Sequence, residues 1–225
     1  MIDKSNWSIS KHTNQYIEDT FLPFDEALDF ALNNSKKQNL PPISINAVEG
    51  KLLYMLTKLK DAKSILELGT LGAYSTIWLA KALPKDGKVV TIEHIEEYAA
   101  CAQENIDHAG LTDTITIKTG DALKVLPQLN ETFDLFFIDA HKEEYIEYVE
   151  HAIRLSHPGS VIICDNVLRN GGVMQEHFAK DYFEHLAKFN KYLAGNPRLE
   201  STILPITLPL KDRDYVDGMS ISVVK

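Results

Sequence analysis

The sequence predicts an α/β fold built on one doubly wound, mostly parallel sheet of seven strands. Two observations support this prediction. Between residues 64 and 164, short apolar runs alternate with stretches of helical periodicity, which is typical of right-handed βαβ units. After residue 200, two apolar segments follow each other with no helix between them, which predicts an antiparallel hairpin at the edge of the sheet.

The composition is that of an ordinary globular protein. A chain of 225 residues predicts one domain, with a helical N-terminal segment over residues 1–60 and a Rossmann-like core over residues 61–225. The formal net charge of −9 disfavours nucleic acid as the main partner, because binding phosphates needs a basic face. Cys101 and Cys164 lack CxxC spacing and are expected to be free thiols.

The sequence carries no pattern typical of export or of a membrane span. Its opening residues lack the apolar stretch of a signal peptide, and no apolar run approaches the ~20 residues that cross a bilayer. Free thiols are typical of a reducing compartment. We therefore expect the protein in the cytoplasm.

The first 60 residues predict helices and no strand. One short helix and one longer helix are expected, separated by Pro41-Pro42. The apolar residues of the short helix are Tyr16, Ile17, Phe21 and Leu22, and those of the longer helix are Ala47, Leu52, Leu53, Leu56 and Leu59.

Five strands are predicted in the core, each an apolar run bounded by turn residues. They are Ser64–Leu68, Lys88–Ile92, Thr114–Lys118, Phe133–Ile138 and Val161–Cys164. Two later strands, Ser201–Pro205 and Met219–Val224, form the predicted hairpin.

Helices fill the intervals between the core strands. The first runs from Ser75 to about Leu83, the second ends at Gly110, a short third helix stops near Pro127, and a fourth precedes the turn at Pro158. A long helix is predicted after residue 172. Its apolar face consists of Phe178, Tyr182, Leu186, Phe189 and Leu193.

Three strand ends carry residues suited to a nucleotide. The first strand runs into a glycine loop that begins at Gly69, although Leu71 prevents a match to the dinucleotide motif GxGxxG. Glu93 ends the second strand about 20 residues later, where a carboxylate can accept both ribose hydroxyls. Asp121, after the third strand, either faces an adenine ring or caps the next helix. Together these ends predict a cofactor that contains adenosine.

The next two strand ends carry oxygen ligands. Asp139 follows the fourth strand, and Asp165 and Asn166 follow the fifth. Ligands of an open α/β sheet bind at the carboxyl ends of its strands, and two carboxylates with one amide suit a hard divalent cation. Lys142 lies three residues beyond Asp139 and places a basic amine beside this predicted metal site.

The chain resembles the class I S-adenosylmethionine-dependent methyltransferases and, more narrowly, the cation-dependent O-methyltransferases of the catechol and caffeoyl-CoA type. The segments that carry the resemblance are LELGTLGAYS, TIEH, TGDAL, FIDAHKEEY and CDNVLRNGG. It extends from about Ile43 to the C-terminal DGMSIS, and the D-A-x-K-x-x-Y and D-N patterns are its specific part.

The resemblance implies a role for each matching residue. The implied ligands of the cofactor are Ile45 on the lid side, Glu67, Gly69, Thr70 and Ser75 at the methionine end, Glu93 at the ribose, Asp121 and Ala122 at the adenine, and Asp139 beside the glycine loop. The implied metal ligands are Asp139, Asp165 and Asn166, and Lys142 is the implied general base.

Two positions depart from the family pattern. Ala73 replaces a glycine before Tyr74, and because a β-carbon disfavours positive φ, a tighter or shifted loop is expected there. Arg169 replaces an aromatic residue that often follows the D-N pattern, which points weakly to an anionic substrate.

The expected activity is methyl transfer from S-adenosylmethionine to a hydroxyl of a small catechol-like aromatic. All-oxygen ligands favour Mg²⁺, with Mn²⁺ or Ca²⁺ as alternatives. Lys142 accepts the proton only as a neutral amine, which a neighbouring positive charge favours. Alternative functions are methylation of a hydroxylated tRNA base, a nucleotide-dependent oxidoreductase and a catalytically silent binding protein. The resemblance also implies a homodimer, with the first 40 residues and residues 170–196 at the substrate pocket or the dimer contact.

Overall fold

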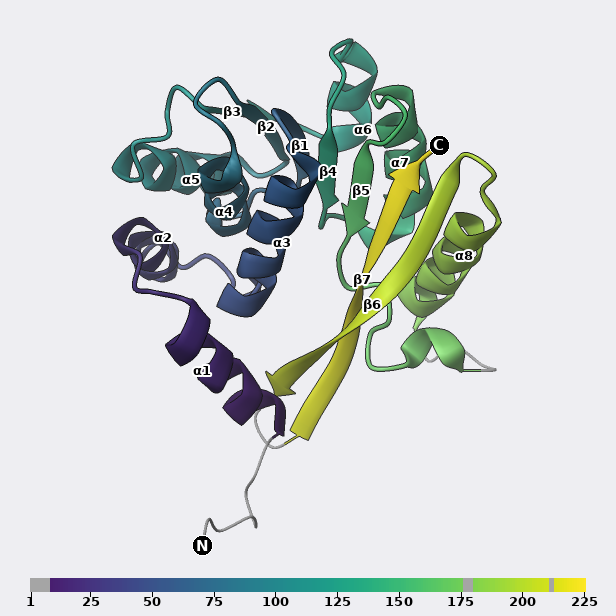
Figure 1. Cartoon of the computed structure of the whole chain (residues 1–225), viewed down its shortest axis with the longest axis horizontal. Coiled ribbons are helices and arrows are strands. Elements are labelled where there is room, and N and C mark those ends of the chain that lie inside the picture. Colours follow the sequence, from purple (N-terminus) through teal and green to yellow (C-terminus); the bar gives the residue numbers. More distant parts are fainter. Residues whose placement is uncertain (1–8, 176–179, 211–212) are drawn as a thin grey trace, which may run out of the picture.

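The computed structural model describes residues 9–175, 180–210 and 213–225 (Figure 1). Within these ranges one sheet contains seven strands in the order β3-β2-β1-β4-β5-β7-β6. The strands are β1 (Ser64–Leu68), β2 (Lys88–Glu93), β3 (Ile115–Thr119), β4 (Leu135–Ile138), β5 (Val161–Cys164), β6 (Leu199–Leu210) and β7 (Arg213–Val224). The first five strands pair in parallel, whereas β7 is antiparallel to both β5 and β6. This is the predicted fold.

Helices cover both faces of the sheet (Figure 1). The helices are α1 (Ile9–Phe21), α2 (Glu26–Lys37), α3 (Ala47–Lys60), α4 (Tyr74–Ala82), α5 (Glu96–His108), α6 (Ala122–Val125), α7 (Tyr145–Arg154) and α8 (Asp181–Gly195). Buried residues of α2 to α5 share one core with one face of the sheet, and those of α7 and α8 share a second core with the other face. None of the helices in the described ranges is long and apolar enough to cross a membrane.

The alternation of side chains along each strand explains the two cores. In β4, Leu135 and Phe137 point into the core beneath α3 and α4, whereas Phe136 and Ile138 point into the core beneath α7 and α8. All four are buried, as expected for a central parallel strand covered on both sides.

The C-terminal hairpin is longer than predicted. Its strands span 12 residues each, and their pairing runs from Leu199 opposite Val224 to Leu210 opposite Arg213. The sequence prediction ended the first strand at Pro205, a residue that cannot donate a ladder hydrogen bond. Since β6 is the edge strand, it tolerates this residue. The outer half of the hairpin leaves the sheet and packs on α1 (Figure 1).

The helix predictions hold with two corrections. The helix α2 was not predicted, because only Leu28, Ala31 and Ser35 of its residues are buried. Leu59 was assigned to the apolar stripe of α3, but its side chain is 77% exposed, since it lies in the last turn. Phe178 lies outside the described residues, and the buried face of α8 consists of Leu186, Phe189 and Leu193.

Candidate active site

The carboxyl ends of five parallel strands form the edge at which the predicted site residues meet. In the register of the sheet, Leu68 at the end of β1 pairs with Ile138 of β4, and Ile138 pairs with Cys164 of β5. The residue that follows each strand is therefore Gly69 after β1, Asp139 after β4 and Asp165 after β5. Backbone hydrogen bonds continue this alignment, from Asp139 N to Leu68 O (2.9 Å) and from Asp165 N to Ile138 O (3.0 Å).

The glycine loop touches the backbone of Asp139. Gly69 has a φ of +93°, and a β-carbon there would lie 2.2 Å from the carbonyl oxygen of Asp139. A side chain at this position would therefore separate the two strand ends. This contact places Gly69, an implied cofactor ligand, next to Asp139, an implied metal ligand.

The rest of the loop has strained backbone. Leu71 and Ala73 have φ angles of +49° and +62°, in the left-handed region that costs a non-glycine residue roughly 1–2 kcal/mol. The β-carbon of Ala73 was expected to tighten or shift the loop. Instead, the alanine adopts the left-handed conformation, which shows that surrounding contacts hold the loop against this cost.

Glu93 is one of these contacts. One of its carboxylate oxygens accepts hydrogen bonds from Thr70 N (3.2 Å) and Leu71 N (2.8 Å), and the other accepts from Ile95 N (2.9 Å). The side chain is buried. Glu93 therefore fixes the glycine loop to the end of β2, in addition to any contact with a ribose.

Glu67 is fully buried behind the loop. Its carboxylate accepts hydrogen bonds from Ser75 Oγ (2.6 Å), Thr76 Oγ1 (2.5 Å) and Thr91 Oγ1 (2.7 Å), and Thr91 in turn contacts Thr70 Oγ1 at 2.6 Å. Burial raises the pKa of Glu67 to about 7, although these hydrogen bonds lower it. Because none of its surface is exposed, Glu67 contacts the loop region only through hydroxyl groups, directly with Ser75 and by way of Thr91 with Thr70.

The third strand end contributes Asp121 and Ala122, both half-buried. The carboxylate of Asp121 accepts a hydrogen bond from Leu123 N (2.9 Å) and caps α6, so the capping alternative is confirmed. Gly120 N donates to Glu93 O (2.7 Å), which places Asp121 next to the implied ribose residue.

Lys142 lies between the two acidic strand ends. Its Nζ donates to Asp139 Oδ1 (2.6 Å) and to the hydroxyl of Tyr145 (2.5 Å), and the side chain is only 11% exposed. The buried Tyr145 hydroxyl donates to the carbonyl oxygen of Asp165 (2.9 Å). The amine is thereby fixed beside Asp139 and near the backbone of Asp165, two of the three predicted metal ligands.

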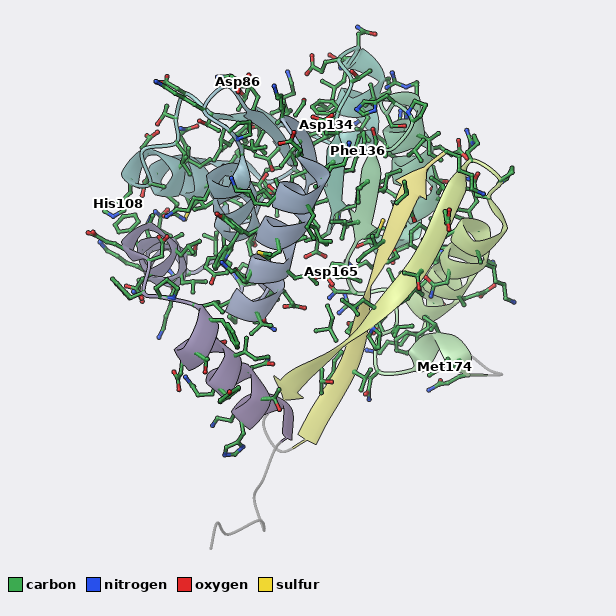
Figure 2. All side chains as sticks on the ribbon, viewed as in Figure 1. Asp86, His108, Asp134, Phe136, Asp165 and Met174 are labelled. Atoms are coloured by element: carbon green, nitrogen blue, oxygen red, sulfur yellow. The ribbon has the colours of Figure 1, made fainter. Side chains whose placement is uncertain are left out.

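Asp165 and Asn166 form a tight turn after β5, at the centre of the view in Figure 2. Asn166 has a φ of +58°, a conformation that asparagine tolerates, and its backbone N donates to Asp165 Oδ1 (2.7 Å). Burial, followed by the charges of Asp139 and Glu49, raises the pKa of Asp165 well above its usual range. A divalent cation would offset this repulsion, so these residues fit a metal.

Two carboxylates and one amide make up this candidate metal set. The described residues contain no group of three His, Cys, Asp or Glu side chains that suits a metal ion. The amide oxygen of Asn166 stays a predicted third ligand beside the carboxylates of Asp139 and Asp165.

Sequence reasoning missed Glu49, which lies in the first turn of α3. Burial raises the pKa of Glu49 to about 7, a hydrogen bond from Asn46 N opposes this rise, and the charge of Asp139 adds to it. Glu49 and Asn46 form a capping box. Because the charge of Asp139 is felt at Glu49, the first turn of α3 lies near the end of β4, and Ile45 just before α3 is buried. The N-x-x-E pattern of residues 46–49 predicts this cap, but it does not predict that Glu49 lies near Asp139.

Asp217 of β7 holds the loop that follows Asn166. Its Oδ1 accepts hydrogen bonds from Leu168 N (3.1 Å), Arg169 N (3.0 Å) and Gly218 N (2.9 Å). The guanidinium of Arg169 lies 4.0 Å from the other oxygen of Asp217. This buried carboxylate balances the charge of Arg169, which weakens the expectation that Arg169 selects an anionic substrate.

Comparison with known proteins identifies the family of this chain. The sequence pattern of a family described as O-methyltransferase matches residues 25–211. A catechol O-methyltransferase of Niastella koreensis is 43% identical over 224 residues, covering 98% of this chain and 100% of the relative. A catechol O-methyltransferase of Mycobacterium tuberculosis is 43% identical over 212 residues, covering 93% of this chain and 94% of the relative.

Solved structures show the same fold. An O-methyltransferase from Bacillus cereus in complex with SAH superposes with a TM-score of 0.89 at 38% identity, covering 97% of this chain and 98% of the other. An O-methyltransferase from Streptomyces achromogenes in complex with SAM superposes with a TM-score of 0.88 at 33% identity, and both chains are covered completely (100%).

Proposed function

This chain belongs to the O-methyltransferase family, and from this premise we propose that it transfers a methyl group from S-adenosylmethionine to a hydroxyl of a catechol-like substrate with the help of a divalent cation. One observation supports this proposal above the others. The Lys142 amine is fixed beside Asp139 and Asp165, and Asp139 in turn contacts the glycine loop at Gly69. A base, two acidic ligands and a cofactor loop are therefore adjacent.

The glycine loop and the adjoining strand ends would hold the methyl donor. Gly69 and Thr70 precede α4 and Ser75 lies in its first turn, where backbone N–H groups without a side-chain cap suit the carboxylate of the methionine part. Glu93 would face the ribose, Asp121 and Ala122 the adenine, and Ile45 the lid side. Relatives with bound SAM and SAH share this fold, which supports the assignment.

Asp139, Asp165 and Asn166 would hold the cation, with Mg²⁺ favoured by the all-oxygen ligand set. When bound, such an ion lowers the pKa of a phenolic hydroxyl and orients the ring. The chain's own contribution is the fixed position of these ligands on adjacent strand ends, which restricts where the substrate oxygen can lie.

Lys142 would remove the proton from the substrate hydroxyl. The substrate oxygen then forms its bond to the methyl carbon while the sulfur–carbon bond breaks, and the electron pair of that bond stays on sulfur. Tyr145 and Asp139 hold the amine on two sides, so its direction toward the acceptor oxygen is set before the substrate arrives.

The catechol relatives favour a small aromatic acceptor over the alternatives. Family membership argues against a nucleotide-dependent oxidoreductase, and the presence of Lys142, Asp139 and Asp165 argues against a silent binding protein. No feature of the site specifically favours tRNA, and the net charge of −9 opposes it.

We also propose that the protein is a homodimer. Apolar side chains of α1 and of the outer hairpin are exposed, among them Tyr16 (66%), Phe21 (62%) and Val216 (41%). Because α1 packs on the hairpin, these side chains belong to neighbouring elements that a second copy can cover together. Light scattering after gel filtration would give twice the chain mass for a dimer and a single chain mass if the proposal fails.

For its location we propose the cytoplasm, because both cysteines are buried free thiols. Cell fractionation with an antibody against the chain tests this proposal, and recovery in an oxidising compartment would contradict it.

The activity is tested with purified protein, S-adenosylmethionine and Mg²⁺, offered a panel of catechol, caffeoyl-CoA and total tRNA. Mass spectrometry should detect a mass increase of one methylene on catechol-type acceptors. Methylation of tRNA alone would replace the proposed substrate class, and no methylated product from any acceptor would contradict the proposal for these classes.

A further inference from the structure

A buried amide on α5 contacts the glycine loop at a residue that Glu93 does not bind. Asn105 has none of its surface exposed, and its Nδ2 donates to the carbonyl oxygen of Gly72 at 2.9 Å. Its Oδ1 accepts a hydrogen bond from Nδ2 of Asn34, on α2, at 2.9 Å. A chain of two amides thus joins α2, α5 and the loop.

The surroundings leave this amide a single useful orientation. Nδ2 lies 3.3 Å from Ser35 Oγ and 3.4 Å from Ala31 O, both potential acceptors, whereas Oδ1 faces the donor Asn34. A flipped amide would turn its oxygen toward the carbonyl of Gly72 and its donors toward the amide nitrogen of Asn34. Gly72 packs so closely on α2 that a β-carbon there would lie 2.0 Å from Ser35 Oγ.

The loop needs such a contact. Leu71 and Ala73, on either side of Gly72, both have positive φ, and strained residues keep their conformation only where the surroundings over-determine it. Glu93 accepts hydrogen bonds from the N–H groups of Thr70 and Leu71, and Asn105 donates to the carbonyl oxygen of Gly72. The two side chains therefore hold successive residues of the loop.

We propose that Asn105 is a positioning residue for the methyl donor, acting through Gly72, and that Asn34 orients its amide. This inference rests on the proposed function, because it assumes that the loop binds S-adenosylmethionine. It gives α2, which contains none of the implied cofactor or metal ligands, a role in cofactor affinity.

The binding of S-adenosylhomocysteine (SAH), measured by calorimetry, tests the proposal. Asn105→Ala should weaken SAH binding about tenfold or more, since a loop carbonyl loses its buried donor. The KM for S-adenosylmethionine should rise similarly while the KM for the catechol stays unchanged. Asn34→Ala is the milder variant, because this side chain is only half-buried, and should weaken SAH binding less. Asn34→Asp should weaken it more than Asn34→Ala, because an acceptor there favours the flipped amide.

Asn196→Ala is the matched control. Asn196 is also a buried amide, at the end of α8, and its Nδ2 donates to the Tyr192 hydroxyl (2.8 Å). This variant should lose stability without losing SAH affinity. Equal SAH affinity in wild type and both Asn105→Ala and Asn34→Asp, or an equal loss in Asn196→Ala, would overturn the proposal.

Hydrogen exchange separates this inference from the proposed function. In Asn105→Ala, the amides of residues 71–74 should exchange faster while those of β4 and β5 keep their protection. Wild-type protein that bound no SAH would overturn the proposed function, and unchanged exchange in the loop would overturn the positioning role of Asn105.

Discussion

The amine of Lys142 donates a hydrogen bond to the carboxylate of Asp139, with Nζ 2.6 Å from Oδ1. The pair places the proposed base next to a proposed metal ligand. Asp139 also contacts Gly69 through its backbone, so the same short segment connects the proposed base, the proposed cation site and the loop proposed to bind the methyl donor.

Lys142→Ala should lower kcat by about 100-fold or more, the range expected for loss of a general base, and leave SAH affinity unchanged. Steady-state kinetics and calorimetry check this prediction. Lys188→Ala is the control, because Lys188 is 64% exposed on α8 and should be dispensable. Full activity in Lys142→Ala would remove this residue from the mechanism.

Asp165→Asn should abolish tight Mn²⁺ binding and retain SAH binding, because the variant loses a charged ligand without altering the glycine loop. Calorimetric titration with Mn²⁺ measures this directly. Asp86→Asn is the control, since the Asp86 side chain is 73% exposed (Figure 2). Equal Mn²⁺ affinity in Asp165→Asn and wild type would place the metal elsewhere.

Asp217→Ala should destabilise the protein by about 3 kcal/mol, since it leaves Arg169 without its counter-charge and three backbone N–H groups without their acceptor. Urea denaturation gives the free energy of unfolding. Asp217→Asn keeps an acceptor oxygen and should cost less. Equal losses in the two variants would show that the charge of Asp217, and not its acceptor, holds the loop.

The pair His157–Asp134 should make stability depend on pH without affecting the site. His157 Nε2 lies 2.8 Å from Asp134 Oδ1, and Asp134 lies at the opposite end of the sheet from Asp165 (Figure 2). Hydrogen bonds to the Pro158 carbonyl and to Asp134 raise the pKa of His157. Burial of Asp134 raises its pKa, but hydrogen bonds from Lys63 N, His157 and Ser64 N outweigh this and lower it.

The raised pKa of His157 and the lowered pKa of Asp134 give the sign of this pH dependence. The contribution of His157 is complete below its unfolded value of 6.5 and is lost as pH rises through its higher folded pKa. The contribution of Asp134 is present above its unfolded value of 3.8 and is lost as pH falls through its lower folded pKa. Denaturation of wild type and His157→Gln should therefore differ at about pH 5 and converge at about pH 9. A constant difference over this range would contradict the pairing.

Strand ends could be predicted from the sequence because a parallel strand leaves a strong local pattern. The apolar run before Asp139 and that before Asp165 identify buried strands, and neighbouring parallel strands must present their last residues at one edge. The proximity of Asp139 and Asp165 could therefore be predicted from the order of the strands alone.

Glu49 and Asn105 could not be predicted in the same way. Each lies on a helix, and its contact partner depends on how that helix packs: Glu49 interacts with Asp139 across 90 positions of sequence, and Asn105 bonds to Gly72 across 33. The local pattern around Asn105 indicates only a helix. The length of the hairpin was missed because Pro205 disfavours a strand unless that strand lies at the edge.

The decisive measurement is methyl transfer from S-adenosylmethionine to catechol, followed by mass spectrometry. It is made before EDTA treatment, after it, and again once Mg²⁺ is restored, and it tests whether the activity depends on a divalent cation. We predict monomethylated catechol with Mg²⁺, its loss with EDTA, and its recovery when Mg²⁺ is added back, with SAH affinity retained throughout. Undiminished methyl transfer in EDTA would contradict the account, because Asp139, Asp165 and Asn166 would then not act through a cation.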